Sequence, residues 1–138
     1  MTVQADFYLL DRPGLELESV LCTLVRKAWT AGFKTSILVK DAEQAKKLDE
    51  ALWQDSGFLA HEILSTEKHS QAPTSLVTTA KHLQPLVINL SSQPLQAFNK
   101  LQRVLEIVPN QASLRQQSRD HYRNYQQLGW QLKMHKIR

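Results

Sequence analysis

The stretch IVPNQASLRQQSRDHYRNYQQLG, residues 107–129, predicts one long helix around which the rest of the chain can be organised. Pro109 disfavours a helical conformation at the residue before it, so the helix should begin after this proline. Asn110 or Ser113 can cap the first turn by accepting a backbone N–H. Gly129 can end the helix in a left-handed conformation.

The two sides of this helix differ in character when successive residues are placed about 100° apart. The side predicted to pack on the protein carries Leu114, Ser118, His121, Tyr125 and Leu128. The other side carries Arg115, Arg119, Tyr122 and Arg123. Asp120, the only acid of the helix, lies off this basic side. Guanidinium groups bind carboxylates and phosphates through paired hydrogen bonds, so the basic side is a candidate site for an anionic partner. A solvated face without a partner is the alternative.

Charge is distributed unevenly along the 138 residues. Residues 1–69 hold 8 Lys/Arg and 11 Asp/Glu, a net charge of −3, whereas residues 70–138 hold 9 and 2, a net of +7. A basic half of this kind suggests an acidic partner, either nucleic acid or an acidic peptide. The single cysteine, Cys22, cannot form a disulfide within the chain, which favours a reducing compartment. With no signal-peptide pattern and no membrane-spanning run, we expect a cytoplasmic protein and no membrane partner.

Strands and helices are expected to alternate along the chain. Apolar runs predict strands at 7–10, 34–39, 76–79, 85–90 and 104–108, with a third strand in pieces at 58–60 and 63–64. Helices are expected at 17–31, ended by Gly32, and at 41–53, capped by Asp41, with a short one around Leu95, Phe98 and Leu101. Residues 65–75 are a predicted surface loop, and residues 130–134 a tail laid against the body.

This alternation predicts an α/β fold. A strand–helix–strand start implies parallel strands joined by a right-handed crossover. We therefore expect residues 1–138 to form a single-domain three-layer sandwich, with a mostly parallel sheet and helices on both faces.

The sequence lacks the motifs of catalytic, cofactor and metal sites. No GxGxxG follows the first strand and no GxxxxGK[ST] is present, so the glycines that let phosphate approach a helix N-terminus are missing. The five histidines have no metal-ligand spacing, and His121 is better explained as a core residue than as a base. We expect no catalytic residue, cofactor or metal, and a binding module rather than an enzyme.

Several stretches together resemble the chi subunit of bacterial DNA polymerase III holoenzyme, an accessory subunit of the clamp loader. The similarity runs nearly end to end, through FYLLD at 7–11, the residues around Cys22 and Trp29, and KKLDEALW ending at Trp53. It continues through FLAH at 58–61 and, after Val108-Pro109, through SLRQQSRDHYRNYQQLGWQL. None of these pieces is a catalytic signature, so their order and spacing carry the resemblance.

The resemblance implies a Rossmann-like fold without an enzymatic role of its own. Members of this family form a one-to-one heterodimer with the psi subunit, which tethers them to the clamp loader. A second surface binds the acidic, phenylalanine-ended C-terminal tail of the single-stranded DNA-binding protein, so contact with DNA is mainly indirect. The family also pairs with a repair-type helicase through the psi-facing surface.

Residues matching the family's binding surfaces can be carried over by position. For the tail, the resemblance implies Val108, Arg115, Arg119, Tyr122, Arg123 and Leu132. Arg115 and Arg123 stand where the family commonly has lysine, and Gln126 stands where a further basic residue occurs. For psi, it implies Trp53 and Phe58, although ordinary partial burial would also explain Trp53.

Two other functions remain open from the sequence. One is a module that binds single-stranded nucleic acid directly through the basic half; such modules interleave exposed aromatic side chains with basic ones, and the basic helix side offers only Tyr122. The other is a small α/β enzyme that uses a nucleotide, against which the missing glycine motifs argue.

Overall fold

The protein contains one parallel sheet of seven strands. The structure is a computed structural model that describes residues 3–11, 14–54, 61–63, 74–80 and 83–137. The strands are β1 (Gln4–Leu10), β2 (Thr35–Leu38), β3 (His61–Ile63), β4 (Thr74–Val77), β5 (Leu86–Asn89), β6 (Arg103–Val108) and β7 (Gln131–Ile137). The helices are α1 (Leu17–Thr30), α2 (Ala42–Gln54) and α3 (Ala112–Gln127). Across the sheet the order is β3-β4-β2-β5-β6-β1-β7.

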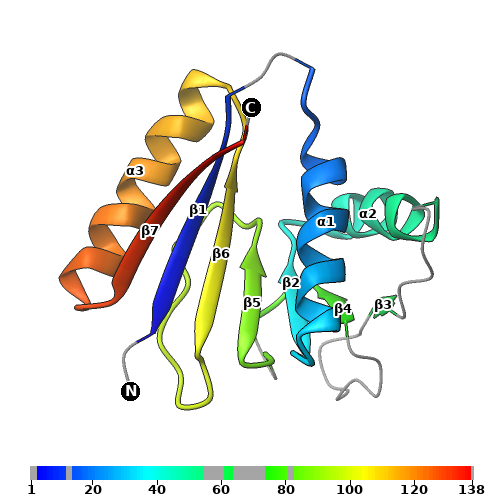
Figure 1. The fold of residues 1–138 in the computed structure, drawn as a ribbon, viewed down its shortest axis with the longest axis horizontal. Coiled ribbons are helices and arrows are strands. Elements are labelled where there is room, and N and C mark those ends of the chain that lie inside the picture. Colours follow the sequence, from blue (N-terminus) through cyan, green and yellow to red (C-terminus); the bar gives the residue numbers. More distant parts are fainter. Residues whose placement is uncertain (1–2, 12–13, 55–60, 64–73, 81–82, 138) are drawn as a thin grey trace.

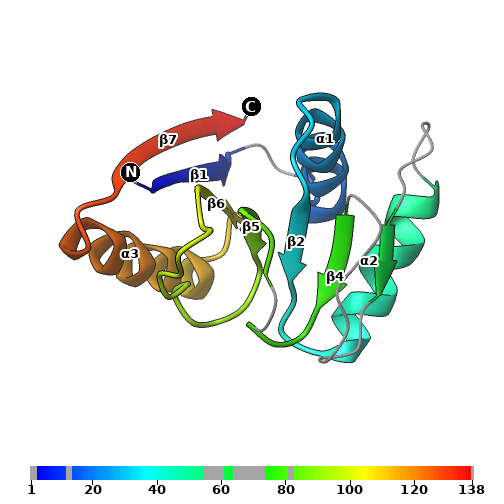
Figure 2. The same cartoon turned by 90° about the horizontal axis from the view of Figure 1, so that it is seen from below.

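Helices cover both faces of this sheet, as predicted (Figures 1 and 2). Side chains alternate between the two faces along each strand. In β2, Ile37 belongs to the core cluster that holds the buried side chains of α1 and α2, whereas Leu38 belongs to the cluster that contains Tyr125 of α3. Because the buried interior strands are apolar on both faces, each face needs a helical layer or a packed loop to cover it. The three-layer α/β sandwich with a Rossmann-like parallel sheet is therefore confirmed.

The helix ends follow local chemistry that the sequence carries. Asp41 accepts the Gln44 N–H at 2.8 Å and so caps α2. Gly129, at φ +79°, donates to the Gln126 carbonyl, and the next N–H donates to the Tyr125 carbonyl. This pair of bonds closes α3 with the left-handed turn that glycine favours. The predicted cap at the other end of α3 is wrong, because Gln111 is the N-cap and its side chain makes no capping bond.

Two predicted segments differ in the structure. No helix forms around Leu95 and Leu101. Both side chains are buried against the α3 face of the sheet, and the Leu95 N–H donates to the Tyr125 hydroxyl, so tertiary contacts replace helical bonds there. The expected tail is strand β7, which pairs in parallel with β1 and forms one edge of the sheet. Leu128, assigned to the packed side of α3, is exposed because the helix already ends there.

The remaining expected strands are present with shifted ends. Strand β3 covers His61–Ile63, and β4 begins at Thr74 inside the predicted loop. Phe58, residues 59–60 and 64–73 lie outside the described residues. The basic side of α3 lies at the end of the sheet far from β3, where β6, β1 and β7 lie beside this helix (Figure 1).

Candidate functional site

The inner side of α3 is fixed by a buried polar network. Glu106 of β6 receives three donors: its Oε1 lies 2.9 Å from His121 Nδ1, and its Oε2 accepts from Tyr125 at 2.6 Å and from Asn89 at 2.9 Å. His121 Nε2 lies 3.1 Å from the Ser92 carbonyl oxygen. Glu106, His121 and Tyr125 are all at most 5% exposed. The network joins α3, β6 and the loop after β5, so it sets the position of the helix.

Both ring nitrogens of His121 face oxygen atoms that accept hydrogen bonds when Glu106 is ionised, so the site fits a doubly protonated ring. A carbonyl oxygen can only accept, and the Glu106 carboxylate already has two other donors on its second oxygen. Burial lowers the pKa of His121, but the hydrogen bond and negative charge of Glu106 outweigh it and raise the pKa above 6.5. Below this raised pKa, the pair is therefore a buried imidazolium–carboxylate ion pair.

Stability should depend on pH through this pair. Because the folded pKa of His121 lies above its unfolded value, the stabilisation is complete below about pH 6.5 and is lost as the pH rises through the folded pKa. We expect the free energy of unfolding, measured in urea from pH 6 upward, to fall by at most about 1.4 kcal/mol per pH unit in that window. His121→Gln should remove this component, whereas His135→Gln should keep it; parallel curves for the wild type and His121→Gln would contradict the ion pair.

The outer side of α3 forms one wall of a cavity of about 460 Å³, here called the basic groove. Its lining residues are Phe7, Leu9, Val108, Arg115, Ser118, Arg119, Tyr122, Arg123 and Met134. The floor comes from side chains of β1 and β6, and the cations come from α3. Tyr122 is half-buried and its ring centroid lies 5.5 Å from that of Phe7, so the phenol is held against the floor. Apolar floor and basic rim together suit a ligand with both an apolar and an anionic group.

The three arginines of the groove differ in how they are held. Arg119 and Arg123 are exposed, and Arg119 donates to the Gln116 side chain at 3.3 Å. Arg115 is half-buried, and its guanidinium lies 3.8 Å from Asp11 at the end of β1. The Nε atom of Arg115 is buried and has no hydrogen-bond partner in the part of the chain that the structure describes. A buried donor without an acceptor is costly, so a ligand carboxylate that reached Arg115 Nε would relieve that cost.

The structure brings together five of the six residues assigned to the tail. Val108, Arg115, Arg119, Tyr122 and Arg123 all line the basic groove. Leu132 does not line it; it is partly buried against the α3-side core, on the same face of β7 as Met134, which does line the groove. Sequence reasoning missed Met134 together with Phe7 and Leu9. The alternation of apolar and polar residues after Trp130 is typical of a strand. The pairing of that strand with β1 could not be predicted from the sequence, because no local pattern specifies it.

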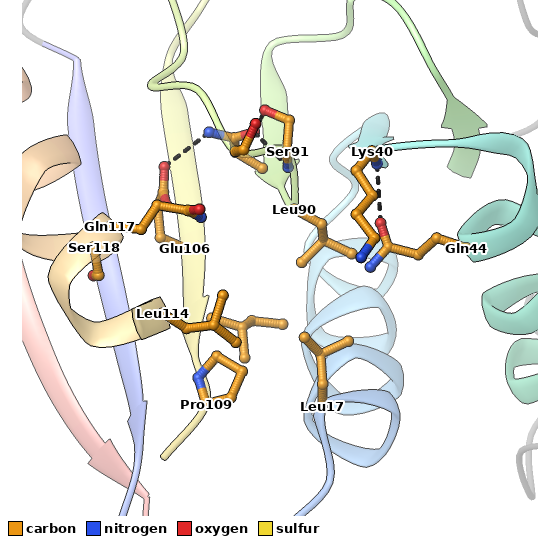
Figure 3. Close-up of a pocket in the computed structure, with 13 residues that line it drawn as sticks. Leu17, Lys40, Gln44, Leu90, Ser91, Glu106, Pro109, Leu114, Gln117 and Ser118 are labelled. Atoms are coloured by element: carbon orange, nitrogen blue, oxygen red, sulfur yellow. Dashed lines mark hydrogen bonds between the residues drawn. The ribbon is translucent and has the colours of Figure 1, made fainter. Parts of the chain in front are cut away.

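On the opposite flank of α3 lies a crevice of about 290 Å³, at the carboxyl ends of β2, β5 and β6 (Figure 3). Rossmann-like folds bind nucleotides in such a crevice. Here Leu17, Pro109 and Leu114 approach one another across it, and Lys40 is the one cation among its described lining residues. Phosphate binding requires exposed backbone N–H groups or several cations. A single cation among the described residues in this position argues against the nucleotide-using alternative.

Of the two residues assigned to psi, Trp53 belongs to α2, which packs at the end of the sheet far from the groove. Trp53, near the end of α2, is 55% exposed. Phe58 lies outside the described residues, so the structure does not place the two together. No described group of three or more His, Cys, Asp or Glu side chains could hold a metal ion. Among the described residues, no helix is long and apolar enough to cross a membrane.

The fold and groove define a Rossmann-like α/β protein with a basic groove beside its last helix. A family model described as DNA polymerase III chi subunit, HolC, matches residues 1–133. The chain therefore belongs to the DNA polymerase III chi subunit family, and its role is that of an accessory subunit in DNA replication.

Curated relatives agree with this assignment over nearly their whole length. Each is named DNA polymerase III subunit chi. The protein from Pseudomonas aeruginosa is 28% identical over 97% of this chain and 96% of its own. The one from Haemophilus influenzae is 28% identical over 96% of each chain. The one from Escherichia coli K12 is 29% identical over 93% of this chain and 94% of its own.

Proposed function

We propose that the basic groove binds the acidic, aromatic-ended C-terminal tail of single-stranded DNA-binding protein. The observation that carries this is the convergence of Val108, Tyr122 and the three arginines on one cavity with an apolar floor. A terminal aromatic ring would enter over Phe7, Leu9 and Val108. Its carboxylate would bind Arg115 and Arg119, and upstream acids would lie near Arg123. If this side of α3 were only solvated and had no partner, neither the apolar floor of the groove nor the buried Nε donor of Arg115 would be expected.

The expected affinity is micromolar. Exposed charge pairs contribute about 0.2–1 kcal/mol each, whereas a desolvated aromatic anchor contributes ~2 kcal/mol or more. Because a DNA strand coated with the binding protein presents many tails, such modest affinity becomes useful through multivalency.

Calorimetric titration with a synthetic tail peptide tests the groove. We expect Arg119→Ala and Arg123→Ala each to weaken binding about two- to fivefold, and added salt to weaken it further. Lys46→Ala on α2 is the matched control, because Lys46 is exposed and lies on the opposite face of the sheet. Lys136 is a poorer control, since it pairs in register with Leu9 and so lies beside the groove; its loss should have a smaller effect than that of Arg119. Unchanged affinity in both arginine variants would overturn the site.

The second proposed surface, which binds the psi subunit, is centred on Trp53 and Phe58. Its support is the resemblance together with the exposure of the Trp53 side chain at the end of α2. Because Trp53 and the basic groove lie at opposite ends of the sheet, one chain would be able to bridge psi to the tail of the single-stranded DNA-binding protein. A repair-type helicase is proposed to use the same surface as psi.

A further inference from the structure

The face of the sheet that carries α1 is not covered by a helix along its whole width. Helix α1 packs on β2 and β6, while β1 and β7 lie to its side (Figure 1). On this part of the face, a polar layer replaces the missing helix. Asp6 of β1 is fully buried beneath it. Arg103 Nε donates to one carboxylate oxygen at 2.6 Å, and His135 Nε2 lies 3.0 Å from the other.

Aromatic and cationic side chains share this surface. The rings of Tyr8 and His135 stack with centroids 4.7 Å apart and planes 13° from parallel. Lys133 pairs in register with Asp6, so its exposed side chain lies on the same face. The buried Asp6 carboxylate neutralises the charge of Arg103. The exposed side chains of Lys27 and Lys133 therefore leave the surface with a net positive charge.

A cavity of about 230 Å³ opens between this layer and α1. Tyr8, Phe33 and Arg103 line it, and Lys27 contributes to the wall that α1 forms. The rest of the lining is apolar, from Leu24, Ala28, Ala31, Leu86 and Leu105. The cavity thus joins aromatic rings to two cations, which is the combination that binds a base with its phosphate.

We propose that this surface, formed by Lys27, Tyr8, Arg103, Lys133 and His135, binds single-stranded nucleic acid directly. One base enters the cavity and contacts the Tyr8 ring, while Lys27, Arg103 and Lys133 bind consecutive phosphates. This site lies on the opposite face of the sheet from the basic groove, so it is independent of the proposed tail binding. An acidic peptide is the less favoured ligand, because aromatic side chains on an open sheet face offer stacking that bases use and carboxylates do not.

Fluorescence anisotropy with a labelled oligothymidylate of about 15 nucleotides tests the surface at low salt. We expect Lys27→Glu/Lys133→Glu to weaken binding at least tenfold. The neutral pair Lys27→Gln/Lys133→Gln should reduce the slope of log affinity against log salt by about 1.4, or ~0.7 for each phosphate that the variant no longer neutralises. Arg119→Glu/Arg123→Glu in the basic groove is the matched control and should change affinity less than twofold.

The base contact is tested separately from charge. Tyr8→Leu and His135→Ala should each weaken oligothymidylate binding while leaving heparin binding unchanged, and thermal melting checks that the variants fold. The proposal is overturned if the lysine variants bind as the wild type does, or if the groove variant loses as much affinity. It is also overturned if the aromatic variants lose both ligands equally, or if thymidine monophosphate competes as well as the strand.

Discussion

Replacing Glu106 with alanine is expected to lower the free energy of unfolding by about 3–5 kcal/mol, because it removes one partner of a buried ion pair. Without the carboxylate, the His121 Nδ1 proton and the Tyr125 hydroxyl proton both lose their acceptor, and Asn89 loses one of its acceptors. Breaking a buried pair on one side costs more than removing both partners, since the remaining group is left desolvated and unpaired. Chemical unfolding in urea at pH 6 measures the loss.

Glu106→Gln is the matched variant for this experiment. Its amide can still accept from Tyr125 and donate to a neutral His121, whose Nε2 proton keeps its bond to the Ser92 carbonyl. We therefore expect a smaller loss than for alanine, together with loss of the pH dependence assigned to His121. If Glu106→Ala stays within about 1 kcal/mol of the wild type, the network does not hold α3 in place.

Replacing Trp53 with alanine is expected to weaken binding of the psi subunit by at least about 30-fold, which corresponds to ~2 kcal/mol. An indole that is 55% exposed before binding offers a large apolar area to a partner at small cost in side-chain entropy. Co-purification with psi, followed by titration of the purified partners, measures the loss. The basic groove lies elsewhere, so binding of the tail peptide should be unchanged.

Trp29 offers the matched control for this substitution. It is also a helical tryptophan with an exposed side chain, at 41%, but it belongs to α1. Trp29→Ala should leave psi binding within twofold of the wild type. Equal losses for the two tryptophans would show that neither is a specific contact, and loss of tail binding with Trp53→Ala would indicate unfolding instead.

The sequence predicted the chemistry of α3 well because helical periodicity is a local property. The spacing of Arg115, Arg119, Tyr122 and Arg123 places them on one side of any regular helix, and the structure has them around one cavity. Leu128 shows the limit of this reasoning: the last turn already departs from regular geometry, and the side chain faces solvent.

Features that depend on distant pairing could not be predicted in the same way. Met134 reaches the groove only because β7 pairs with β1 in a fixed register, which sets Met134 beside Phe7. The partner of His121 is likewise a strand residue, Glu106, which no local pattern connects to it. The spacing of Leu95 to Leu101 fits a helix, yet the Tyr125 hydroxyl and the core decide the conformation of Leu95.

Because β1 pairs in parallel with both β6 and β7, the basic groove can form only late in synthesis of the chain. Strand β1 is made first, but β6 leaves the ribosome about 100 residues later and β7 about 130 residues later. Contacts of such long sequence separation form slowly, because the intervening chain must be ordered before they are made. An unfinished chain would therefore expose the apolar segment Phe7–Leu10 and have no groove for an anionic peptide. Competence to bind such a peptide would arise in one late step, when β7 adds to β1.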